Sequence, residues 1–308
     1  MSISDIAMLM LCGSISGFLA GLLGIGGGMI LVPFMILVFN HLGFSQNIIV
    51  HMAIATGMAT ILFTTTSAIW AHHKQNSIDW KLVTALSPGL VIGSLVGGSE
   101  IFEAINTSWL SLVFALFIVY TSIQMIINKK PSAGRELPGA AGLFSFGALT
   151  GVIASLVGAG GAFITVPFML WCNVKPHTAM ASSSGLGFPI AAAATIGYMY
   201  GSWGNPNLPE GSLGFVYVPA VLCIVAVSIF TAPLGAKMAR KLDVAQLKRI
   251  FGVMLFLLAA FMFNESRKAF GFKVDIVNAV SWCIADVKYS SVLYPSHYEA
   301  SQKRFLNA

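Results

Sequence analysis

Gly17–Met35 reads GFLAGLLGIGGGMILVPFM, and Gly151–Met169 repeats it as GVIASLVGAGGAFITVPFM. The two copies are identical at 11 of 19 positions, and the offset is 134 residues throughout. Each copy carries Gly-Xaa-Gly-Gly, at Gly24–Gly27 and Gly158–Gly161, with a proline farther along the apolar run. An internal duplication in an apolar chain is typical of a transporter, and helix-breaking glycines inside it indicate where a substrate binds.

The composition places this chain in a lipid bilayer. Of its 308 residues, 56% are hydrophobic and 9% are charged, whereas soluble domains carry about 25% charged residues. Apolar stretches of about 20 residues, the length needed to cross the hydrocarbon, recur almost from end to end. We therefore predict an all-α, polytopic membrane protein. No cleavable signal peptide is expected, because the N-terminus lacks a basic region.

The charged and sulfur-containing residues exclude several other classes. The net charge of +6 comes largely from Lys and Arg in short loops, which is typical of topology signals and not of nucleic-acid binding. The four cysteines are widely spaced and form no CxxC motif, so neither a metal nor another cofactor is expected. Carboxylates within the apolar segments, Ser-His-Asp arrangements and zinc-type spacings are missing, which counts against an enzyme.

The apolar segments form two halves of five. We predict a first transmembrane repeat at 1–128, a cytoplasmic linker at 129–138, a second repeat at 139–265, and a tail of unassigned role at 266–308. A second match supports the division, because His51–Thr56 resembles His177–Ser182 at an offset of 126. The predicted segments are 5–23, 27–40, 46–71, 82–99 and 108–128, followed by 139–157, 161–173, 177–200, 213–236 and 248–264.

Loop charges predict that the two repeats are inverted. Connection 72–81 is basic and its counterpart 201–211 has no Lys or Arg, while 99–107 has none and its counterpart 237–249 has five. Because Lys and Arg mark cytoplasmic loops, matched loops should lie on opposite sides of the membrane. Inversion requires the first two segments of each half to form a helical pair that enters and leaves on the same side.

The duplicated glycines are the main candidate for a substrate site. Segment 27–40 has 14 residues and spans roughly 21 Å, which is short of the roughly 30 Å hydrocarbon core. Glycine allows the backbone to turn sharply, and a helix that restarts there directs free N–H groups and a positive dipole end at an anion. The residues expected to contact substrate here are Gly26, Gly27, Gly28, Gly160 and Gly161.

Close helix packing is the alternative interpretation of these glycines. It is favoured for Gly13, Gly17 and Gly21, and for Gly93 and Gly97, which follow the small-xxx-small spacing of helix interfaces. A dinucleotide-binding loop is not expected, because the match to GxGxxG is weak and its strand–helix context is absent.

Polar side chains near the glycines are few and small. Thr56, Ser182 and Ser183 are the preferred hydroxyl contacts to substrate, and Thr56 and Ser182 are matched by the duplication. These hydroxyls, with Thr60, Thr64, Thr65, Thr66 and Ser184, could equally donate to their own helix backbone. His51 and His177 are also matched and are candidates for proton or anion contact, or for a structural role at the interface.

The motif resembles a known family. The stretch Gly17–Gly28 with Pro33, its second copy, and Thr66–His73 (TSAIWAHH) are similar to the sulfite exporter TauE/SafE family of permeases, over about residues 5–265. The resemblance implies a multi-pass inner-membrane carrier for sulfur-containing or organic anions, such as sulfite, sulfoacetate, thiosulfate or other sulfonates, often in export. The second copy departs from the triple glycine, because Ala162 replaces Gly28.

These observations lead to one function and two alternatives. The expected function is a secondary transporter, and specifically an exporter, of a small anion by alternating access between the two repeats. A channel-like anion pore with glycine backbones as its filter is the first alternative. A membrane sensor or enzyme that uses the tail is the second. Homo-oligomerisation is left open.

Overall fold

The computed structural model describes residues 2–23, 28–74, 76–127, 134, 136–238, 252–260 and 263. The chain divides into two compact units, Met1–Phe263 and Asn264–Ala308. The second unit, most of the predicted linker and the first glycine motif up to Gly27 lie outside the described residues. The account below therefore concerns the first unit, which contains both predicted repeats except residues 264–265.

The regular secondary structure in the described part of this unit is helical apart from one small β-ribbon. Seven helices there are long and apolar enough to cross a membrane, and two shorter apolar helices accompany them. This confirms the predicted all-α membrane fold. The helices are α1 (Ile3–Leu23), α2 (Gly28–His41), α3 (Ile49–His73), α4 (Trp80–Gly98), α5 (Glu100–Ala104), α6 (Thr107–Ile127), α7 (Ala140–Val157), α8 (Ala162–Trp171), α9 (Pro176–Gly201) and α10 (Val218–Met238). Residues 252–260 are helical as well.

Two elements differ from the predicted segments. The apolar run predicted at 213–236 is divided, because β1 (Ser212–Leu213) and β2 (Val216–Tyr217) pair antiparallel before α10 begins. Gly211 and Gly214 adopt positive φ angles of 84° and 57°, which a continuous helix cannot accommodate. The short helix α5 was also not predicted. It follows α4 at Ser99, whose backbone (φ −94°, ψ −121°) is not helical.

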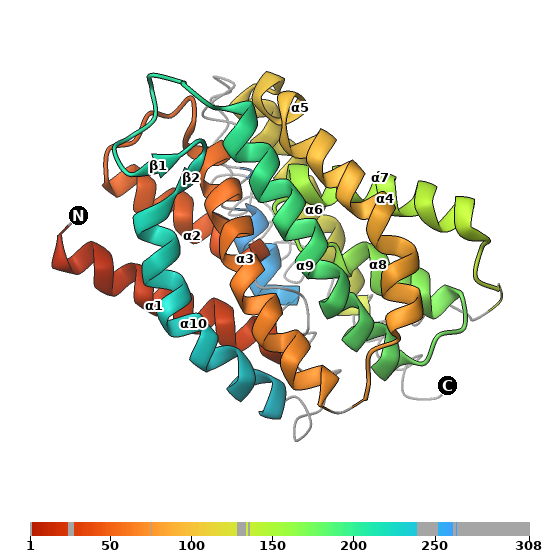
Figure 1. Ribbon diagram of the computed structural model, residues 1–308. Coiled ribbons are helices and arrows are strands. Elements are labelled where there is room, and N and C mark those ends of the chain that lie inside the picture. Colours follow the sequence, from red (N-terminus) through yellow and green to blue (C-terminus); the bar gives the residue numbers. More distant parts are fainter. Residues whose placement is uncertain are drawn as a thin grey trace, which may run out of the picture. The chain divides into compact units, whose positions relative to one another are not determined.

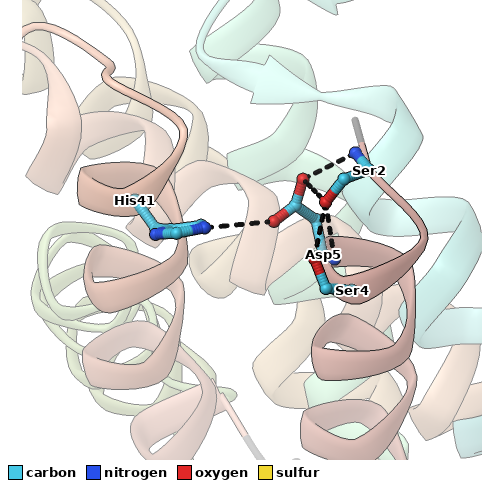
Figure 2. Close-up of polar contacts among 4 residues, drawn as sticks. All are labelled: Ser2, Ser4, Asp5 and His41. Carbon is cyan, nitrogen blue, oxygen red and sulfur yellow. Dashed lines mark hydrogen bonds and ion pairs between the residues drawn. The ribbon is translucent and has the colours of Figure 1, made fainter.

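The helices α1 and α2 form a pair in which the start of α1 lies beside the end of α2 (Figure 2). Ser2 and Asp5 cap α1 reciprocally, since Asp5 Oδ2 accepts from the Ser2 N–H at 2.7 Å and the Ser2 hydroxyl accepts from the Asp5 N–H at 3.4 Å. The other oxygen of Asp5 lies 3.6 Å from Nε2 of His41, the last residue of α2. The first turn of α1 and the last turn of α2 are therefore neighbours, as the predicted helical pair requires.

Small residues allow two matched helix pairs to pack at backbone distance. In the first pair, Gly13, Gly17 and Gly21 of α1 face Ile224, Ser228 and Ala232 of α10. In the second pair, α7 packs on α4, where Gly147 and Gly151 face Leu86 and Leu90. Among the facing residues, Leu86 corresponds to Ile224 and Leu90 corresponds to Ser228, both at an offset of 138 residues. Each contact therefore joins a helix of one half to a helix of the other.

The core helices α3 and α9 lie side by side and run antiparallel (Figure 1). Thr65, late in α3, contacts Gly187 in the first half of α9. At the opposite end, His51 and Tyr198 both pack on Phe102. We call the end at which α3 begins the His51 end, and the end at which α3 finishes the Lys74 end. The matched segments that begin at His51 and His177 thus point in opposite directions.

The close contact between α4 and α7 should fail if a side chain is inserted. In Gly93→Val, the new Cβ would overlap the Ala148 carbonyl, and the helices must separate. We expect a loss of roughly 1–3 kcal/mol, measured as a lower thermal unfolding midpoint in detergent. The neighbouring substitution Ile92→Leu changes a side chain that is 50% exposed and should leave the midpoint unchanged. Equal midpoints for the two variants would contradict this account of the interface.

Candidate functional site

The second glycine motif forms a turn between α7 and α8. Gly158 ends α7 in the left-handed conformation (φ 65°), and the Ala159 N–H donates to the Ala154 carbonyl at 3.1 Å. This satisfies the last carbonyls of α7 in the manner of a Schellman motif. Gly161 (φ 73°) then precedes α8, whose first residue is Ala162. The sequence thus predicted the position of this helix break correctly.

Protein covers the turn on several sides. A Cβ at Gly158 would lie 3.0 Å from Ile54 of α3, and a Cβ at Gly161 would lie 2.6 Å from Ile190 of α9. Residues 158–162 are all buried. Because α3 and α9 are the two core helices, the break lies inside the helical unit, where irregular backbone can be tolerated in a membrane.

The start of α2 reaches the same place. A Cβ at Gly28 would overlap the carbonyl oxygen of Gly158 and lie 2.5 Å from Ile61 of α3. The first residue of the short helix in one half therefore touches the turn of the other half. The contact also explains the departure of the second copy from triple glycine, since Gly28 has no room for the methyl group that Ala162 carries. Gly26 and Gly27 precede this contact and lie outside the described residues.

Two buried hydroxyl groups lie beside the start of α8. Thr165 Oγ1 is 2.9 Å from Ser183 Oγ and donates to the Gly161 carbonyl at 3.1 Å. Both side chains are 1% exposed. With the Thr165 proton directed at the backbone, the Ser183 proton is the one that can rotate towards a ligand.

Thr165 was missed by the analysis of the sequence. The signal available was its contrast with the matched residue Leu31, because a hydroxyl replaces an apolar side chain four residues after Gly161. Ser183 was predicted, and its counterpart is Gly57. The hydroxyl pair therefore belongs to the second half alone.

Most of the other candidate hydroxyls serve their own helix. Thr60 donates to the Gly57 carbonyl at 2.6 Å, and Thr65 donates to the Ile61 carbonyl at 2.7 Å. Thr64, Thr66 and Ser184 donate to carbonyls three or four residues earlier in the same way. These hydroxyls therefore follow the alternative interpretation of the sequence, in which they donate to the backbone of their own helix.

Thr56 and Ser182 accept hydrogen bonds from other elements. Thr56 Oγ1 accepts from the N–H of Tyr217, immediately before α10, at 3.0 Å. Ser182 Oγ accepts from the N–H of Asp79, immediately before α4, at 2.9 Å. Both side chains are completely buried. The structure therefore places these two predicted contact residues at matched helix junctions, with one oxygen lone pair of each already used.

The matched histidines occupy different surroundings. His51 is buried, and its Nε2 lies 3.0 Å from the carbonyl oxygens of both Phe102 and Ile105. Its ring stacks on Phe215 with centroids 5.1 Å apart. This geometry ties α3 to the segment around α5 at the His51 end. His177, in contrast, is exposed at the start of α9.

The turn is polar without being charged. All Asp, Glu, Lys and Arg side chains in the described parts of the chain lie at helix ends or in connections. No group of three or more His, Cys, Asp or Glu residues that could hold a metal ion occurs among the described residues. The N–H groups of Ala162 and Phe163, which have no partner within α8, and the Ser183 hydroxyl can offer hydrogen bonds to an anion.

A multi-pass helical unit with a buried break between its core helices is the architecture of a membrane transporter. The chain belongs to the sulfite exporter TauE/SafE family, whose sequence pattern matches residues 9–262. This confirms the family resemblance that the duplicated glycine motif indicated.

Relatives of known description agree with the family. A probable membrane transporter protein of Haemophilus influenzae is 33% identical over 260 residues, which cover 84% of this chain and 98% of the relative. A probable membrane transporter protein of Methanocaldococcus jannaschii is 24% identical over 268 residues, covering 83% of this chain and 94% of that protein. No solved structure matches the chain. Together with the apolar helices, these matches identify a multi-pass membrane transporter.

The turn should be far less tolerant of a side chain than an open turn of the same geometry. Gly161→Ala must place a Cβ at φ 73° and displace Ile190, whereas Gly43→Ala has a similar φ of 76° and nothing within 4 Å. We expect Gly43→Ala to lose about 1–2 kcal/mol of stability from the left-handed backbone alone, and Gly161→Ala to lose roughly 1–3 kcal/mol more. Thermal unfolding in detergent measures both, and equal losses would contradict the crowded turn.

Proposed function

We propose that this chain is a secondary carrier that moves a small sulfur-containing or organic anion across the inner membrane by alternating access. Sulfite, sulfoacetate, thiosulfate and other sulfonates are the candidate substrates. The observation that carries the proposal is the contact of Gly28 with the Gly158 carbonyl, because it brings the start of α2 to the turn that precedes α8. A single small anion placed there would meet both helix N-termini.

Binding uses neutral donors. The N–H groups at the start of α8 and its positive dipole end face the turn, and Thr165 and Ser183 lie beside them. An oxyanion has several acceptor oxygens, so it can take N–H and O–H hydrogen bonds together. The Ser183 hydroxyl would rotate from Thr165 to the anion. His51 stays outside this proposal, because both of its ring nitrogens already have neighbours at hydrogen-bond distance.

The directions of the helices support an inverted repeat. Thr56 of α3 contacts Tyr217, immediately before α10, and Ser67 of α3 contacts Ile229 within α10, so these two helices run parallel. The helix α3 is antiparallel to α9, its counterpart in the second half. In an inverted repeat the α1–α2 pair enters from the His51 end and the α7–α8 pair from the Lys74 end. Each half then offers one helix start to the substrate.

The distribution of charge supports an orientation. The lysines in the described residues, Lys74, Lys81, Lys175 and Lys237, lie at the ends or connections of helices at the Lys74 end. Among the described carboxylates, Asp5, Glu100, Glu103 and Glu210 lie at the opposite end, and Asp79 and Glu136 lie at the Lys74 end. Since Lys and Arg are retained on the cytoplasmic side, the Lys74 end faces the cytoplasm and the His51 end faces outward.

Proteoliposome transport tests the proposed function. Purified full-length protein should take up sulfite, thiosulfate or sulfoacetate with saturation, in preference to sulfate and simple carboxylates. Vesicles preloaded with the accepted substrate should accelerate the uptake of labelled substrate. Linear flux without this acceleration would favour a pore, and the absence of any anion flux would overturn the proposal.

Variants locate the site in the same assay. Removing both hydroxyls by Thr165→Val with Ser183→Ala should raise the half-saturating concentration about tenfold or more, because the lost hydrogen bond from Ser183 to a charged group is worth roughly 1.5–3 kcal/mol. The control variants Thr60→Ala and Ser184→Ala remove hydroxyls that donate to their own helix, and they should transport normally. Equal effects of the test and control variants would place the substrate elsewhere.

Single cysteines test the inversion. Asn76 lies in the exposed connection between α3 and α4, and Asn207 lies in the exposed connection after α9. In intact cells of a cysteine-free variant, a membrane-impermeant maleimide should label Asn207→Cys and leave Asn76→Cys unlabelled until the membrane is permeabilised. Labelling of both residues from the same side would end the inverted-repeat proposal.

A further inference from the structure

Two hydrogen bonds join the halves at matched positions. The hydroxyl of Thr56 on α3 accepts from the N–H of Tyr217, and the hydroxyl of Ser182 on α9 accepts from the N–H of Asp79. Their lengths are 3.0 Å and 2.9 Å. The donors correspond as well, since each is the residue before the first residue of α10 or α4, which are counterparts in the two halves. One arrangement thus occurs twice, with the halves exchanged.

The two bonds lie at opposite ends of the helical unit. Thr56 is near the start of α3, at the His51 end, and Ser182 is near the start of the antiparallel helix α9, at the Lys74 end. Both hydroxyl side chains are fully buried. The surroundings of both donors are ordered, because the Asp79 side chain caps α4 through the N–H groups of Lys81 and Leu82, and Tyr217 packs against Phe39 and Phe44.

We propose that these bonds are a pair of opposing latches, each of which holds one end of the carrier closed. The inference rests on the proposed alternating access and deepens it by assigning positioning roles to Thr56 and Ser182. Opening the His51 end requires α3 to move away from the start of α10, which breaks the Thr56 bond. Opening the Lys74 end requires α9 to move away from the start of α4, which breaks the Ser182 bond.

Loss of either hydrogen bond should change the relative populations of the two open forms of the carrier. In the closed form, loss of the hydroxyl removes the acceptor of an N–H whose bond is buried at Tyr217 and part-buried at Asp79, whereas water can reach that N–H freely when the end is open. Thr56→Val should therefore favour the form that is open at the His51 end, and Ser182→Ala should favour the form that is open at the Lys74 end. If the two hydroxyls had only a structural role, the loss of either one would loosen both ends of the helical unit or neither end.

Matched reporters are available for each end. Ala53 and Ala179 are related by the same offset of 126, are 0% exposed, and lie three residues before Thr56 and Ser182. Each is replaced singly by cysteine in a full-length, otherwise cysteine-free variant in lipid nanodiscs. The labelling rate with a soluble maleimide then reports how often each end opens, and no substrate is needed.

The proposed latches predict that the two variants change the labelling rates at the two ends in opposite directions. Thr56→Val should accelerate labelling of Ala53→Cys about fivefold and slow labelling of Ala179→Cys, and Ser182→Ala should produce the reverse pattern. Thr56→Ser and Ser182→Thr keep the acceptor oxygen and should restore the original rates. Ser184→Ala, whose hydroxyl bonds within α9, should change neither reporter.

The same change at both reporters, or no difference between the test variants and the hydroxyl-retaining variants, would overturn the proposal. Size-exclusion profiles establish that each variant is folded, and Thr56→Ala replaces Thr56→Val if valine does not fit. Failure of anion transport in proteoliposomes would overturn the proposed function and leave the labelling result intact. Unchanged labelling in a protein that transports anions would overturn the latches alone.

Discussion

A backbone that crosses a membrane must satisfy its N–H and C=O groups within the protein, and the helix break at Gly158–Gly161 depends on this constraint. The last carbonyls of α7 are satisfied by the left-handed turn at Gly158. The first N–H groups of α8 have no such intrahelical partner, so the break must lie where protein, water or a ligand can approach it. Burial against α3 and α9 meets this requirement and makes the start of α8 an uncharged donor site.

The duplication gives the two halves similar helix packing, and the positions at which the halves differ include the polar groups beside the turn. Packing of α1 on α10 and of α7 on α4 follows the same residue offset, and the junction hydrogen bonds are matched too. The polar content is unequal, because Thr165 and Ser183 correspond to Leu31 and Gly57. In the proposed site, the hydroxyls therefore come from the second half, and the first half contributes the close backbone approach of Gly28.

The sequence was sufficient for the helices and insufficient for the side-chain contacts. Apolar length and the duplicated glycines predicted the membrane helices and the break before α8 correctly, because both depend on local composition. The ribbon before α10 was missed because Phe215, Val216 and Tyr217 are apolar and read as part of the helix. Thr165 was missed, and the hydrogen bond from Tyr217 to Thr56 was not foreseen, because the partner of a hydroxyl is set by residues distant in sequence.

The absence of charged side chains from a binding site determines whether the membrane potential can drive a carrier. In the described residues no Lys, Arg, Asp or Glu lies at the turn, so a bound anion would cross the membrane with its own charge uncompensated by a side chain. An inside-negative potential then drives outward movement with about 2.3 kcal/mol per charge per 100 mV. A lysine or arginine at the turn would cancel this force, and a carboxylate would repel the substrate. In the proposed carrier, backbone N–H groups and the Ser183 hydroxyl would hold the anion while preserving the electrical drive, so the proposed export would need no coupling ion.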